Sequence, residues 1–196
     1  MTIPDILKYK YVLASKSPRR INLLKQIGLD FIAIDSEAEE WDSNEFKPVM
    51  ITKINTGRKV NAVIGKAKGR IIISADTIVA INKKILHKPA SVKDAKNYLR
   101  LLSGKKHTVY TGVLVVNPVK KKTCFDYEKT DVYFRRLKST EINYYVENYN
   151  PLDKAGSYGI QDDFGCLFIE KINGDFYNVV GLPLAKLSEM ILKVIK

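Results

Sequence analysis

The segment 71–80, IIISADTIVA, constrains the fold of this chain more than any other stretch. Its apolar character predicts a strand over 70–75, which 77–81 either continues or re-forms after a break. Asp76 is the one charged residue in the segment. Because burying a carboxylate costs several kcal/mol unless it is paired or binds a metal, Asp76 is a candidate metal ligand or general base. The alternative is an aspartate that begins a turn, which the flanking isoleucines disfavour.

Strand and helix patterns alternate in the first half of the chain, and a hairpin follows in the middle. This order predicts an α/β fold with an elongated mixed sheet flanked by helices. We expect one compact domain over residues 1–196, in which two lobes can enclose a cleft. The further expected strands are 9–14, 31–34, 107–116, 123–134 and 166–172, and the expected helices are 17–26, 48–68, 91–102, 139–148 and 182–195.

The stretch 13–20, LASKSPRR, joins the first expected strand to the first expected helix. Ser17 can cap this helix, and Pro18 suits its first position. A helix start exposes backbone N–H groups and the positive end of the helix dipole, which together attract phosphate. Arg19 and Arg20 oppose that dipole and therefore invite an anion, although an ordinary surface arginine pair explains the stretch equally well.

Three further polar positions are candidates for binding an anionic ligand. Lys59 lies within an expected helix, and Lys88 precedes a proline that extends the backbone. Gln161 follows a glycine-rich loop and carries both a donor and an acceptor, which suits the edge of a nucleobase. The alternatives are solvated lysines and a structural loop. The acidic segment 36–44 is either solvated or a source of metal-binding carboxylates.

Composition narrows the chemistry further. Two cysteines and two histidines argue against a disulfide framework or a zinc cluster, so a metal ion would be held by carboxylates, which favours Mg²⁺. The net charge of +12 suggests an anionic ligand, although lysines on solvated faces explain most of that excess. No apolar stretch is long enough to span a bilayer and no signal architecture is visible, so we expect a soluble, cytoplasmic protein.

Taken in order, these pieces resemble the Maf family of nucleoside triphosphate pyrophosphatases over nearly the whole chain. The resemblance implies a fold similar to that of inosine triphosphate pyrophosphatases and hydrolysis of a nucleoside triphosphate to the monophosphate and pyrophosphate with a divalent metal, Mg²⁺ or Mn²⁺. The matching motifs are Leu13-Ala-Ser-Lys-Ser-Pro-Arg-Arg20, Leu23-Leu24 with Gly28, Lys59, Ala75-Asp-Thr-Ile-Val79, Lys88-Pro89, Leu102-Ser-Gly104 with His107, Thr111-Gly-Val113, Asp153-Lys-Ala-Gly-Ser-Tyr158 with Ile160-Gln161, and Val179-Val-Gly-Leu-Pro-Leu184.

The resemblance also implies roles for individual residues. Asp76 matches the proton acceptor of the family and one of its metal ligands. Glu40, or else Glu39, falls at the acidic position that holds the metal together with Asp76. The phosphate-handling positions of the family match Ser15, Arg19, Arg20, Lys59 and Lys88, and the positions linked to substrate selectivity match Arg19, Thr77 and Gln161.

The motifs look most like the branch that hydrolyses dTTP and UTP, and they imply a homodimer that binds a nucleotide and no membrane. Two alternatives remain open at this point. One is a pyrophosphatase acting on 7-methyl-GTP. The other is a nucleic-acid-binding or cell-division regulatory protein, which the net charge of +12 motivates. We expect no nucleic-acid partner, because the sequence carries no recognised DNA- or RNA-binding signature.

Overall fold

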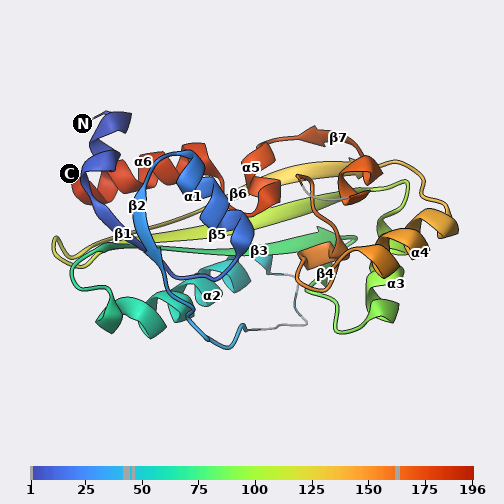
Figure 1. Ribbon diagram of the computed structural model, residues 1–196, viewed down its shortest axis with the longest axis horizontal. Coiled ribbons are helices and arrows are strands. Elements are labelled where there is room, and N and C mark those ends of the chain that lie inside the picture. The colour runs from blue at the N-terminus through green and yellow to red at the C-terminus, as the bar shows by residue number, and fades with distance from the viewer. Residues whose placement is uncertain (1, 42–44, 46, 162–163) are drawn as a thin grey trace.

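The computed structural model of the chain describes residues 2–41, 45, 47–161 and 164–196. Within these residues, seven strands form one long mixed sheet in the order β2-β1-β3-β5-β6-β7, with β4 paired to β3 (Figure 1). The strands are β1 (Lys10–Leu13), β2 (Asp30–Ala33), β3 (Ile71–Ile81), β4 (Lys84–Leu86), β5 (Lys106–Asn117), β6 (Lys122–Phe134) and β7 (Ile169–Asn173). The expected α/β class with a mixed sheet is confirmed.

The sheet changes direction at β3. This strand pairs in parallel with β1, which in turn pairs in parallel with β2, whereas β3, β5, β6 and β7 form an antiparallel series. β3 runs unbroken from Ile71 to Ile81 and every residue except Thr77 is buried, so the segment 77–81 continues the strand. Asp76 therefore lies inside a central strand, and the alternative of a turn aspartate is wrong.

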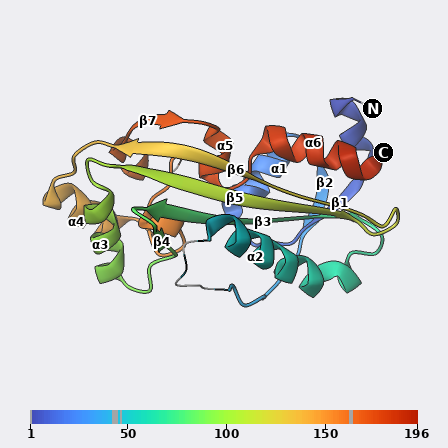
Figure 2. The same cartoon turned by 180° about the vertical axis from the view of Figure 1, so that it is seen from behind.

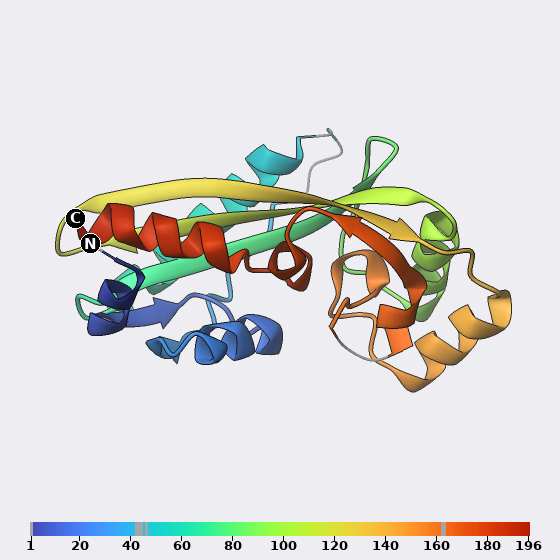
Figure 3. The ribbon, with the colours of Figure 1, turned by 90° about the horizontal axis from the view of Figure 1, so that it is seen from above.

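Helices cover both faces of the sheet, as Figures 1 and 2 show from opposite sides. The helices are α1 (Pro18–Gln26), α2 (Pro48–Val63), α3 (Val92–Leu102), α4 (Ser139–Asn148), α5 (Phe176–Val180) and α6 (Leu184–Ile195). Alternate residues of β3 divide between the faces: Ile71 and Ile73 pack with α1 and α6, whereas Ile72 packs with α2. Helices α3 and α4 lie at the end of the sheet opposite the two chain termini (Figure 3).

Within the described residues, the sheet carries three apolar cores. One gathers β1 with the apolar faces of α1 and α6, and a second joins Val60 and Val63 of α2 to Ile72 on the opposite face of the sheet. The third gathers α3, α4 and the ends of β3, β5 and β6 that lie beside them. No helix in the described part of the chain is both long enough and apolar enough to cross a membrane.

Several local expectations differ from the structure. Ser17 occupies the N-cap position of α1, but its side chain makes no capping hydrogen bond. The strand expected at 166–172 begins only at Ile169, because Phe164–Phe168 forms a 3-10 helix. α5 was not expected; it is a short helix whose first turn Asp175 caps by accepting from the backbone of Tyr177 and Asn178. Residues 42–44 of the acidic segment lie outside the described residues.

Candidate active site

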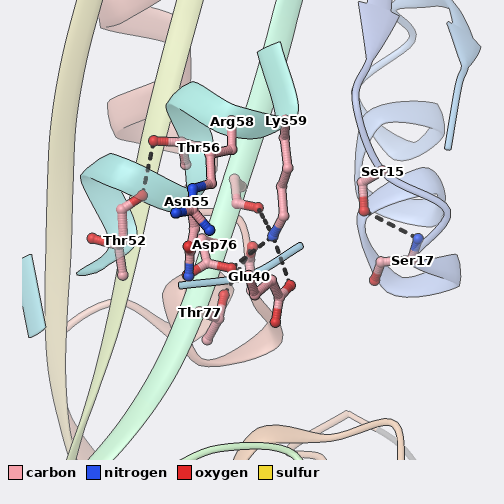
Figure 4. Close-up of polar contacts among 12 residues, drawn as sticks. Ser15, Ser17, Glu40, Thr52, Asn55, Thr56, Arg58, Lys59, Asp76 and Thr77 are labelled. Carbon is pink, nitrogen blue, oxygen red and sulfur yellow. Dashed lines mark hydrogen bonds and ion pairs between the residues drawn. The ribbon is translucent and has the colours of Figure 1, made fainter. Parts of the chain in front are cut away.

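The carboxylate of Asp76 is held on both of its oxygens by side chains of α2 (Figure 4). The Lys59 ammonium lies 2.7 Å from Oδ1, and the Asn55 amide nitrogen donates to Oδ2 at 3.1 Å. Asp76 is only 4% exposed and Lys59 only 6%. Ionic partners and further hydrogen bonds together offset the desolvation cost of a buried charge. The structure therefore explains how a carboxylate is kept within an apolar strand.

The two partners of Asp76 come from one stripe of α2. The buried side chains of α2 follow helical spacing, and those in the middle of the helix are polar: Thr52, Asn55, Thr56 and Lys59. Ile51 precedes this polar run, and Val60 and Val63 follow it as part of an apolar core. Lys59 is thus not the solvated lysine that its sequence context allowed. The polar run supplies both α2 partners of Asp76.

Glu40 approaches the same ammonium from the segment before α2. Its Oε1 lies 2.9 Å from Lys59 Nζ and 3.7 Å from Lys88 Nζ. Desolvation acts to raise the pKa of Glu40, but the positive charges of Lys59, Lys88 and Arg20 hold that pKa below its ordinary value. Glu40 is therefore a carboxylate at neutral pH. One ammonium thus joins the carboxylates of Glu40 and Asp76.

Arg20 lies in the first turn of α1, where its guanidinium connects three segments. Its Nε donates to the Gly181 carbonyl at 2.9 Å, Nη2 donates to Thr77 Oγ1 at 3.1 Å, and Nη1 lies 3.4 Å from Ser15 Oγ. Burial lowers the pKa of the guanidinium. Thr77 Oγ1 also lies 2.9 Å from the hydroxyl of Thr111 on β5. Arg20 therefore fixes the start of α1 against β3 and the end of α5.

Arg19, its neighbour, reaches a different segment. Its Nη1 pairs with Asp153 Oδ2 at 2.9 Å, and Nη2 donates to the Asp153 backbone carbonyl at 3.1 Å. Desolvation acts to raise the pKa of Asp153, but the hydrogen bond and charge of Arg19 bring it below its ordinary value. The pair links α1 to the loop that leads to Tyr158 and Gln161. The two arginines of 13–20 thus hold different parts of the chain.

These side chains line one cleft of about 670 Å³, a volume typical of small-molecule sites. All of the sequence-predicted site residues meet there: Ser15, Arg19, Arg20, Glu40, Lys59, Asp76, Thr77, Lys88 and Gln161. Glu39 does not line the cleft, although its backbone carbonyl accepts a hydrogen bond from Arg58.

The cleft also contains residues that the sequence does not single out, and two of them contact predicted site residues. Asn55 could have been found, because it stands four residues before Lys59 and therefore on the same side of a helix. Asp153 was noted only within a motif, and its pairing with Arg19, 134 residues away, leaves no local signal in the sequence.

A family model for Maf-like proteins matches residues 10–194 of the chain. The chain belongs to the Maf family. This confirms the resemblance that the motifs indicated. A protein of Dictyoglomus thermophilum named dTTP/UTP pyrophosphatase is 42% identical to this Maf-family chain over 186 residues, which are 94% of the chain and 96% of that protein. A protein of Bacillus mycoides with the same name is 46% identical over 178 residues, or 91% of the chain and 92% of that protein.

Among solved structures, the Staphylococcus aureus Ham1 protein resembles the chain with a TM-score of 0.42 and 16% identity. The likeness covers 64% of this chain and 71% of that one.

The donor set of this Maf-family site fits a hard divalent cation. Asp76 and Glu40 direct carboxylate oxygens at the same ammonium, so the two groups converge from different segments. Mg²⁺ is commonly held by one or two carboxylates together with substrate phosphates and waters. Within residues 2–41, 45, 47–161 and 164–196, no group of three or more His, Cys, Asp and Glu side chains is placed to hold a metal ion. Two carboxylates would leave positions in the coordination shell of such a cation for phosphate and water oxygens.

Proposed function

We propose that the protein hydrolyses dTTP and UTP to the nucleoside monophosphate and pyrophosphate. Family membership supports this, as do the names of relatives that are 42% and 46% identical over more than nine-tenths of the chain. The cleft adds independent support, because it brings the buried carboxylate of Asp76 together with six lysine and arginine side chains, among them Arg19, Arg20, Lys59 and Lys88, alongside further carboxylates such as Glu40. Phosphoryl transfer depends on positioning and charge neutralisation more than on covalent chemistry.

Asp76 is the general base in this proposal. A water oxygen attacks the α-phosphorus and gives its proton to the Asp76 carboxylate. The bond between the α-phosphorus and the bridging oxygen breaks, and its electron pair leaves with pyrophosphate. The hydrogen bonds from Lys59 and Asn55 orient the carboxylate, and each of its oxygens retains a further lone pair to accept a proton.

Lys59, Lys88 and Arg20 supply positive charge for the triphosphate, and Ser15 lies beside the start of α1, where backbone N–H groups favour phosphate. Glu40 and Asp76 would hold a divalent cation, Mg²⁺ or Mn²⁺. When bound, that cation would neutralise charge that develops on the phosphate oxygens.

Nucleotide selectivity is assigned to Arg19, Thr77 and Gln161. All three line the cleft, and Arg19 connects α1 to the loop that carries Gln161. An amide side chain offers one donor and one acceptor, which suits the edge of a pyrimidine.

The single observation that carries the proposal is the buried Asp76–Lys59 pair in a cleft lined with cationic side chains. The test is a panel of dTTP, UTP, CTP and 7-methyl-GTP with Mg²⁺ or Mn²⁺, followed by pyrophosphate release. We expect turnover to be highest with dTTP and UTP, and hydrolysis in ¹⁸O-labelled water to place the label in the monophosphate. Preference for 7-methyl-GTP, or label in pyrophosphate, would contradict the proposal.

We also propose a cytoplasmic homodimer. The family resemblance supports the dimer, and the location follows from a substrate drawn from the nucleotide pool. Light scattering of the purified protein should give twice the monomer mass of 22.3 kDa. A mass equal to the monomer at micromolar concentration would exclude the dimer.

A further inference from the structure

Gly112 of β5 lies directly opposite Asp76. The two residues are paired across the antiparallel β3–β5 ladder, and directly opposed residues in such a ladder project from the same face of the sheet. That face carries α2, because Asp76 bonds Asn55 and Lys59 of this helix. Gly112 belongs to the motif Thr111-Gly-Val113, to which the proposed reaction assigns no role.

The space in front of Gly112 is filled by α2. A Cβ atom added at this glycine would lie 2.5 Å from Thr52 Oγ1, 2.6 Å from Thr52 Cβ and 3.2 Å from Phe125 Cε2. Carbon atoms in favourable contact stand about 3.5–4.0 Å apart. Rotating the Thr52 side chain would move Oγ1 but not Cβ, which is fixed to the helix backbone. A side chain at position 112 therefore requires α2 to move away from the sheet by about 1 Å.

That movement would act on the proposed base. Asn55 and Lys59 follow Thr52 on the same stripe of α2, one and two turns later. Their contacts with Asp76, at 3.1 and 2.7 Å, exceed hydrogen-bonding length if the helix moves outward by about 1 Å. We propose that Gly112 is a positioning residue, whose missing side chain lets α2 approach β5 closely enough for Asn55 and Lys59 to hold Asp76.

The kinetic part of this inference rests on the proposed function, so the test needs a second readout. Asn55 supplies one, because its Oδ1 accepts a hydrogen bond of 2.6 Å from the backbone N–H of Trp41. Trp41 is the one tryptophan of the chain, so selective ¹⁵N-tryptophan labelling yields a single backbone amide resonance. The exchange rate of that amide with solvent reports the position of Asn55 without any substrate.

The experiment compares Gly112→Ala with Gly112→Ala/Thr52→Gly, in which both clashing Thr52 atoms are removed. Gly57→Ala is the matched control, because a Cβ atom at this glycine of α2 meets nothing within 4 Å. Thr52→Gly alone measures what a glycine costs at that helix position. Circular dichroism of each variant establishes that it is folded at the assay temperature.

We expect Gly112→Ala to lower kcat for dTTP about a hundredfold with a smaller change in KM, since a misplacement of about 1 Å can cost that much. The Trp41 amide should exchange at least about tenfold faster, as expected when a hydrogen bond worth about 1.4 kcal/mol or more is lost. The double variant should recover most of both effects, and Gly57→Ala should match the wild type.

Three results would overturn the inference: unchanged Trp41 exchange in folded Gly112→Ala, a double variant that is no better than Gly112→Ala although Thr52→Gly alone is active, or an effect of Gly57→Ala as large as that of Gly112→Ala. If the wild type shows no turnover, the proposed function fails, but the exchange measurements still decide the positioning role of Gly112.

Discussion

Lys59 Nζ lies 2.7 Å from Asp76 Oδ1 in a buried ion pair that joins α2 to β3. Neither side chain exposes more than 8% of its surface, so each compensates a charge that is largely withdrawn from water. Removing one member of such a pair destabilises a protein by about 3–5 kcal/mol, because the other charge is left unpaired. Every substitution at this pair must therefore be accompanied by a measurement of folding.

Asn55 offers a test of the site that leaves the ion pair intact. Asn55→Ala removes one hydrogen bond to a charged group, worth about 1.5–3 kcal/mol, and we expect kcat to fall about tenfold or more. Asn55→Asp should cost more, because it puts a second carboxylate 3.1 Å from Asp76. Thr56→Val is the control, since the Thr56 hydroxyl donates to backbone carbonyls of its own helix. Full activity of Asn55→Asp would contradict this account.

Glu40 and Glu39 provide a matched pair for the cation site. Glu40→Gln should raise the Mg²⁺ concentration for half-maximal activity by about tenfold or more, with little change in kcat at saturating Mg²⁺. Glu39→Gln makes the same change of charge outside the cleft and should leave the Mg²⁺ requirement unchanged. Mg²⁺ titrations of both variants decide the matter. Equal shifts would mean that net charge, and not a ligand, is responsible.

Arg19 and Arg20 should differ in what their loss does. Arg20→Ala removes contacts to Gly181 and Thr77, so turnover should fall on every nucleotide and the unfolding temperature should drop. Arg19→Trp breaks the link to Asp153 and should change the ratio of kcat/KM between dTTP, UTP and 7-methyl-GTP more than Arg20→Ala does. Parallel losses on all nucleotides in both variants would remove the distinction between the two arginines.

His107 predicts a dependence of stability on pH. Burial lowers the pKa of His107 to about 3, and its Nε2 lies 2.7 Å from the hydroxyl of Tyr158. Below the ordinary pKa of 6.5 the unfolded chain binds a proton that the folded chain does not, so the free energy of unfolding decreases as the pH falls from about 6.5 towards 3. By pH 4.5 this loss amounts to about 3 kcal/mol.

The control for this effect is His107→Phe/Tyr158→Phe, which removes the titrating group without leaving the Tyr158 hydroxyl unpaired. Urea unfolding between pH 4.5 and 7.5 should show a shallower pH dependence in the double variant than in the wild type. Identical slopes in the two proteins would show that other groups cause the acid sensitivity.

The central strand and the longer helices were predictable because their patterns are local. The apolar run at 71–81 marks β3, and Ser91, the first residue of the expected helix 91–102, caps α3 by accepting a hydrogen bond from the backbone of Asp94. The short elements were harder, because three residues of β4 and five of α5 carry too few side chains to show a period. Tertiary contacts, and not local preference, decide such segments.

The candidate site was predictable in its members but not in its connections. Asp76 stood out because one charge in an apolar strand must have a partner. That Lys59 is this partner depends on how closely α2 packs on β5, which no local pattern encodes. The role of Arg19 likewise depends on Asp153, whose position is set by the fold.

The most direct test of the whole account is the rate of pyrophosphate release from dTTP and UTP by Asp76→Asn at saturating Mg²⁺. Asparagine keeps the shape of the side chain but cannot accept the proton from water, and circular dichroism and thermal unfolding must first show that the variant is folded. The account predicts a wild-type enzyme active on both nucleotides and a variant with a rate at least about a hundredfold lower, the lower end of what a general base contributes. Near-normal turnover by folded Asp76→Asn would contradict it.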